Sequence, residues 1–145
     1  ENQKIHIPLK IILVEANWLP ALMFEVGGNV EKMNFYLDRV FEIDPGNMDA
    51  RIRAANNLLN SRQEAKARQH LEVLLKLPEE KQPRPEELIA ELSFPQGVLL
   101  LADIYKRTQR SKVGKEILEQ ALLVANQKGN RIWITQLQNE IARYR

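Results

Sequence analysis

Side chains that could carry out catalysis are scarce in this chain of 145 residues. It contains no cysteine, which excludes thiol nucleophiles, thiolate metal ligands and disulfides. Its serines, Ser61, Ser93 and Ser111, lie in no nucleophile-elbow motif and have no histidine nearby in sequence. The adjacent acids Glu79–Glu80 and Glu86–Glu87 would point to different sides of a helix, which does not suit an acid–base pair. We therefore predict that the chain is not an enzyme.

Metal and cofactor sites are not indicated either. His6 and His70 lie far apart in sequence, and no acidic residues accompany them at a spacing typical of metal ligands. Gly27–Gly28 is not followed by the Lys-Ser or Lys-Thr of a phosphate-binding loop. Trp18 and Trp133 are interpreted as packing residues. We expect no bound metal and no cofactor.

The charge of the chain does not favour nucleic acid as a partner. Twenty-one Lys and Arg face nineteen Asp and Glu, for a net charge of +2. One basic run, Lys106–Lys115 (KRTQRSKVGK), is interpreted as a solvated turn and helix face. The apolar stretch Ile11–Val14 is far too short to span a bilayer.

The elements that would position a binding site repeat along the chain. A shift of 34 residues places Ala21 on Ala55, and a further shift of 47 places Ala55 on Ala102. The first shift also aligns Leu37 with Leu71. A period of about 34 residues is typical of two-helix repeats. Because the second shift exceeds the first, we expect an insertion before the third repeat.

Within each repeat, apolar residues recur at helical spacing. Asp49–Leu59 and Val30–Ile43 each carry an apolar stripe typical of an amphipathic helix. Gly27–Asn29 separates two such helices, and Ser61 with Glu64 is predicted to form a capping box that starts another. Alternation typical of a strand is limited to the brief Ile5, Ile7 and Leu9.

This pattern resembles the tetratricopeptide repeat family, whose first helix carries a large residue, then a small pair, then an aromatic. The matching positions are Asn17, Pro20, Ala21 and Phe24; Arg51, Ala54, Ala55 and Leu58; and Val98, Leu101, Ala102 and Tyr105. The resemblance implies an all-α fold, an αα-superhelix of about three helix pairs plus a C-terminal capping helix, with about seven helices in all. It implies burial of Ala21, Ala55 and Ala102 where paired helices approach closely.

The predicted organisation is a single domain, 1–145. Its repeats span about 14–47, 48–78 and 95–128, with an insertion at 79–94 and a capping helix at 130–145. The insertion is expected to be a Pro-rich loop followed by a short helix from Pro85. Pro20 lies inside the first predicted helix, so we expect that helix to begin near Pro20 or to kink there.

In the tetratricopeptide family the first helices of successive repeats line a concave groove that binds peptides. Transferred residue by residue, the groove positions of this chain are Trp18, Leu22, Glu25, Asp49, Ile52, Arg53, Asn56, Asn60, Leu99, Asp103, Lys106 and Arg107, with Trp133 at the end. We expect the amides of Asn56 and Asn60 to hold a peptide backbone. Some relatives hold a terminal carboxylate with Lys and Asn, but Trp18 and Leu22 stand at those positions here, so that ligand is not predicted.

The resemblance thus predicts a protein–protein interaction scaffold that binds a peptide or helix of a partner in the groove. The alternative is a structural spacer or self-association module of a larger, membrane-anchored bacterial protein, with the apolar segment Ile5–Leu13 docking on a second copy. Since the chain begins at Glu1 without Met, we expect a fragment of a protein in the bacterial cytoplasm or periplasm. An exposed apolar patch near the N-terminus would favour the alternative, and a deep polar groove would favour the scaffold.

Overall fold

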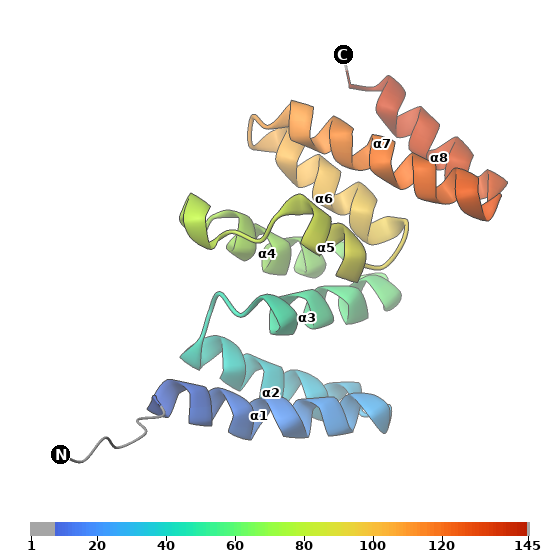
Figure 1. Ribbon diagram of the computed structural model, residues 1–145. Coiled ribbons are helices and arrows are strands. Elements are labelled where there is room, and N and C mark those ends of the chain that lie inside the picture. Colours follow the sequence, from blue (N-terminus) through green and yellow to red (C-terminus); the bar gives the residue numbers. More distant parts are fainter. Residues whose placement is uncertain (1–7, 145) are drawn as a thin grey trace. The chain divides into compact units, whose positions relative to one another are not determined.

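A computed structural model describes residues 8–144, which form eight α-helices, one short 3-10 helix and no strand (Figure 1). The helices are α1 (Leu9–Val26), α2 (Val30–Ile43), α3 (Met48–Asn60), α4 (Glu64–Leu75), α5 (Pro85–Glu91), α6 (Gln96–Arg107), α7 (Ser111–Lys128) and α8 (Arg131–Ala142). This confirms the predicted all-α fold of three consecutive helix pairs followed by a further helix. The helices number eight instead of about seven because α5, inside the insertion, adds to the other seven.

The chain divides into two compact units, Glu1–Ala54 and Ala55–Arg145, and the boundary falls within α3. In the first unit α1 packs along α2, and the two are joined by the predicted turn at Gly27–Asn29. Gly28 has a φ of 76°, and the Asn29 side chain accepts a hydrogen bond from the Lys32 N–H as the cap of α2. The core beneath contains Ala21, Met33, Leu37, Val40, Ala50 and Ala54.

The start of α1 was predicted wrongly: the helix begins at Leu9, and Pro20 lies inside it. Its first turns are held by contacts that the proline does not affect. Asn17, which is buried, donates to the Leu13 carbonyl over 2.9 Å and accepts from Arg39 Nε over 2.9 Å. Val14 packs on the core of the same unit. These contacts fix the helix before Pro20, so the loss of one backbone N–H donor at the proline is tolerated.

The turn between α3 and α4 also differs from the prediction, because Ser61 forms no capping box. Its hydroxyl donates back to the Asn57 carbonyl over 2.7 Å. Arg62 adopts a left-handed conformation with a φ of 60°, and the next residue, Gln63, donates its N–H to the Leu58 carbonyl over 2.7 Å. This closure caps the C-terminus of α3, and α4 then starts at Glu64 without a side-chain cap.

The insertion has the predicted form. A 3-10 turn at Glu79–Lys81 follows Pro78, and α5 begins at Pro85. The amide of Gln82 donates to the carbonyls of Leu75 and Leu77, which ties the loop to the end of α4.

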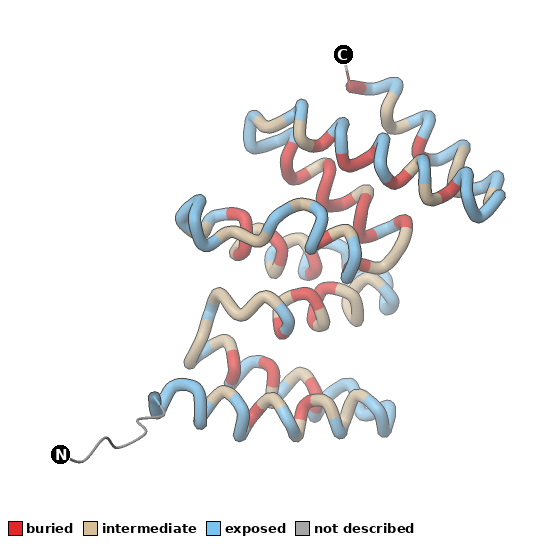
Figure 2. The backbone as a smooth tube through the Cα atoms, in the orientation of Figure 1, coloured by how far each residue is buried: buried red, intermediate tan, exposed pale blue. Residues whose placement is uncertain are grey.

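Close contact between α6 and α7 organises the second unit, and α8 packs on α7 in turn (Figure 1). Ala102 on α6 and Gly114 on α7 are both buried, and Leu137 of α8 is fully buried. Tyr144, which follows α8, reaches back to donate its hydroxyl to the Ala102 carbonyl over 3.0 Å. Figure 2 shows the buried positions along α6 and α7 in red. Ala21, Ala55 and Ala102 are all at most 1% exposed, which confirms the predicted burial.

Gly114→Ala should destabilise the second unit. A Cβ at Gly114 would lie 2.8 Å from the Ala102 carbonyl oxygen and 3.2 Å from the Tyr144 ring. Overpacking of this kind costs about 1–3 kcal/mol of unfolding free energy, measurable by urea denaturation. The control is Gly27→Ala, whose Cβ would meet nothing closer than 3.5 Å and whose φ of −77° suits alanine. Equal stability of the two variants would contradict this account of the α6–α7 contact.

Candidate functional site

The first unit brings three of the predicted groove residues together. Arg53 of α3 forms an ion pair with Glu25 of α1. Its guanidinium carbon also lies 5.5 Å from the centre of the Trp18 ring, within cation–π range. Leu22, one helical turn after Trp18, is half-buried, and Asp49, one turn before Arg53, is exposed. Trp18, Leu22, Asp49 and Arg53 are therefore all accessible at least in part.

Two other predicted groove residues have roles inside the chain. Ile52 is buried, with 4% of its surface exposed, so it offers a partner little area. Asn56 donates its amide N–H to the Glu91 carbonyl over 2.9 Å and accepts from the backbone N–H of Ser93 over 2.8 Å. The Ser93 hydroxyl lies 3.1 Å from the same Asn56 oxygen. The amide that was expected to hold a peptide thus ties α3 to the segment between α5 and α6.

Asn56→Ala should therefore lower the stability of the protein. The substitution leaves the Ser93 N–H and the Glu91 carbonyl without this partner, which costs roughly 1–3 kcal/mol where the groups are buried. Asn60→Ala is the matched control, because Asn60 is exposed at the last position of α3. Thermal melting should separate the two variants by several degrees. If both melt with the wild type, the Asn56 contacts contribute nothing to folding.

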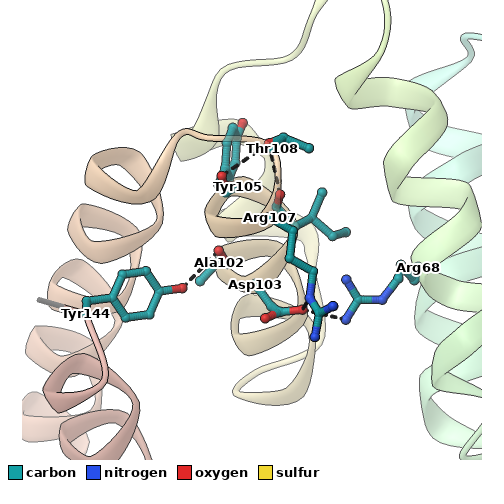
Figure 3. A network of polar contacts seen from close by, with 8 residues as sticks. Arg68, Ala102, Asp103, Tyr105, Arg107, Thr108 and Tyr144 are labelled. Carbon is teal, nitrogen blue, oxygen red and sulfur yellow. Dashed lines mark hydrogen bonds and ion pairs between the residues drawn. The ribbon is translucent and has the colours of Figure 1, made fainter.

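Asp103, also a predicted groove residue, lies between two arginines (Figure 3). Arg68 of α4 approaches one carboxylate oxygen at 2.7 Å, and Arg107 of α6 approaches the same oxygen at 2.8 Å. Burial acts to raise the pKa of Asp103, but the hydrogen bonds from Arg68 and Arg107 outweigh it and hold the pKa below its ordinary value. Asp103 thus joins α4 to α6 as an ionised carboxylate. The sequence gave no sign of Arg68, because it belongs to a second helix of a repeat.

On the other side of α6, Tyr144 packs against Ala102 (Figure 3). Burial is the main cause that raises the pKa of Tyr144 to about 12, and the negative charges of Asp103 and Glu140 add to it. Lys106, another predicted groove residue, places its ammonium nitrogen 4.9 Å from the centre of the Tyr144 ring. Sequence reasoning missed Tyr144 because it follows the last helix and belongs to no repeat position.

Tyr144→Phe removes the hydrogen bond to Ala102 and should cost about 1 kcal/mol at neutral pH. Because the folded-state pKa of Tyr144 is raised, the stability from its neutral form is fully present below the ordinary tyrosine pKa and is lost as the pH rises through about 12. Titration by phenolate absorbance should show a late transition in the wild type that Tyr144→Phe lacks. Tyr36→Phe serves as the control and should retain it. Ionisation of Tyr144 near its ordinary pKa would contradict the buried contact.

The largest uncovered apolar surface lies on the side of α1 that faces away from its own core. Its residues are Leu9, Ile12, Leu19, Met23 and Val26, all exposed, up to 74% for Met23 and 89% for Val26. Figure 2 shows α1 mostly in pale blue and tan. Glu15 is the single charged residue on this side of the helix at 100° per residue. The predicted apolar segment Ile5–Leu13 covers only its start, and residues 5–7 lie outside the part of the chain that the structure describes.

The second unit carries Leu99 and Asn60 separately. Leu99 lines a hollow of about 300 Å³ together with Leu59, Arg62, Glu64 and Gln96. Within residues 8–144, no group of three or more histidines and acids is arranged to hold a metal ion. No helix in that range is long and apolar enough to cross a membrane.

Comparisons with known proteins report on the fold alone. No protein-family model matches the chain, and a comparison with curated proteins finds no match either. Among solved structures, the chain is similar to the N-terminal domain of stress-induced protein-1 from C. elegans, with a TM-score of 0.58. The similarity covers 92% of this chain and 98% of that one, at 10% sequence identity. It is consistent with the tetratricopeptide-like helical repeat fold that the sequence predicts.

Proposed function

We propose that this chain is a non-catalytic protein-interaction module and that the outer face of α1 is its principal contact surface. The observation that carries the proposal is the apolar character of α1 on all sides. Val14, Ala21 and Phe24 contact the core of their own unit, while Leu19 and Met23 on the opposite side are exposed. A helix that is apolar all round is normally buried, and an extended exposed apolar patch marks an interaction site.

The shape and charge of this face suit a helix of another polypeptide. Eighteen residues of α1 correspond to a length of about 27 Å, enough for several turns of a partner helix. A partner of this kind would place its own apolar stripe along Leu9, Ile12, Leu19 and Met23. Burial of such side chains contributes about 25 cal/mol per Å² of apolar surface removed from water.

A peptide groove remains a second proposed contact surface. Its accessible residues are Trp18, Leu22, Asp49 and Arg53 in the first unit and Asn60, Leu99, Lys106 and Arg107 in the second. Trp and Arg are the residue types that contribute most often to binding energy at protein interfaces, and here Arg53 lies over Trp18. Ile52, Asn56 and Asp103 are left out because burial or internal hydrogen bonds occupy them.

The alternative function, self-association, is favoured by the same face of α1. The stripe from Leu9 to Val26 is apolar along its whole length, so an identical stripe could pair with it about a two-fold axis. The contact of each copy would then be the same set of residues. The exposed apolar patch near the N-terminus is the feature expected of this alternative.

A pair of lysine substitutions on α1 tests both possibilities. Leu19→Lys with Met23→Lys should abolish the contact, because it places two charges in the apolar stripe. Since both side chains are exposed, the unfolding free energy should change by no more than about 0.5 kcal/mol per site. The matched control is Leu123→Lys with Ile132→Lys, which alters two exposed apolar residues on α7 and α8.

Light scattering at several concentrations distinguishes the outcomes. Dimers that are lost only in the α1 variant would establish self-association. A monomeric wild type that cross-links to a second protein, with the cross-link lost only in the α1 variant, would establish a separate partner. Identical behaviour of the α1 variant and the control variant in both measurements would reject the outer face of α1 as the contact surface.

A further inference from the structure

A hollow of about 330 Å³ in the second unit has a strongly basic lining. Lys106 contributes from the end of α6, Ser111, Lys112 and Lys115 from the start of α7, and Arg143 and Tyr144 from the segment that follows α8. The lining thus contains four cationic side chains and no acidic one. The volume is at the lower end of the range of small-ligand sites, about 300–1,000 Å³.

The structure divides the basic run Lys106–Lys115 into cations with internal partners and cations without them. Arg107 pairs with Asp103 at 2.8 Å. Arg110 donates to the Gln82 side chain over 3.2 Å, and its guanidinium carbon lies 4.7 Å from the Tyr105 ring centre. The three lysines of the run, in contrast, all line the hollow, and no ion pair joins Lys112 or Lys115 to an acid within residues 8–144.

Nearby acids do not balance these charges. Glu140 is paired with Arg143 at 2.9 Å, and Asp103 is held by two arginines. The chain as a whole carries only +2, so the positive charge at the hollow is a local concentration. Like charges gathered around one concave site repel one another, and a bound anion would relieve that repulsion.

The walls of the hollow are held in place by the packed part of the unit. Tyr144 is 8% exposed, and its hydroxyl donates away from solvent to the Ala102 carbonyl. Gly114, between Lys112 and Lys115 on the same helix, allows the close contact of α7 with α6 and with the Tyr144 ring. The ammonium groups therefore extend from a fixed frame, which reduces the ordering cost of binding.

We propose that this hollow binds an acidic segment of a partner protein, a short run of Asp or Glu side chains. The proposal rests on the proposed function as an interaction module but uses a surface separate from α1. Three lysines on flexible stems are point charges that suit several separate carboxylates. Phosphate groups are held better by the two-pronged geometry of arginine, and the one arginine here is already paired with Glu140.

The test uses the whole chain and a fluorescently labelled decapeptide of alternating Glu and Gly, measured by anisotropy at low ionic strength. Lys112→Ala with Lys115→Ala should weaken binding about tenfold. The matched control, Lys66→Ala with Lys128→Ala, removes the same charge from exposed positions outside the hollow and should change binding by no more than about twofold. A peptide with Gln in place of Glu should not bind.

Each contrary result has a defined meaning. Equal losses in the two lysine variants would show a response to net charge alone and overturn the site. Absence of binding to the wild type, or tighter binding of inorganic triphosphate that displaces the peptide, would overturn an acidic protein segment as the ligand. Leu19→Lys with Met23→Lys should leave the peptide affinity unchanged, so failure of the α1 proposal and failure of this one are separate results.

Discussion

Close approach of paired helices at a small residue is the constraint on which the rest of the structure depends. In the second unit the Ala102 carbonyl, the bare Cα of Gly114 and the ring of Tyr144 meet at distances that leave no space for another methyl group. Ala21 has the same role beside Leu37 and Val40 in the first unit. Because these positions set the spacing of the helices, larger side chains must lie on either side of them, and the apolar periodicity of the sequence follows from that requirement.

The helix pairs could be predicted because each is local: its apolar stripe, its turn and its small residue lie within one repeat of the sequence. The errors arose where a distant contact outweighs a local preference. Pro20 suggested a helix start, yet Asn17 and Arg39 hold the turns before it. Ser61 and Glu64 matched a capping box, but closure around Arg62 satisfies the end of α3 first. No single-sequence pattern records such competition.

The candidate sites were harder to predict than the fold, for a related reason. A groove position inherited from a repeat pattern specifies which way a side chain points but not what another segment brings to it. Asn56 points toward the segment after α5, which the insertion supplies, and its amide is used there. Asp103 meets Arg68 in the same way. An insertion therefore changes polar positions from binding residues into structural ones without altering the helical pattern around them.

The two outermost helices in sequence show what the proposed contact surface means physically. α8 covers α7 with Leu137 and presents mostly polar residues on its other side, such as Gln136, Gln138 and Asn139, which water solvates at no cost. α1 covers α2 in the same way, but its other side carries Leu19, Met23 and Val26. Terminal helices of repeat proteins need a polar outer face to remain in solution. Packing within its own unit requires only one side of α1 to be apolar, so the apolar residues on the other side are best explained by contact with another polypeptide surface.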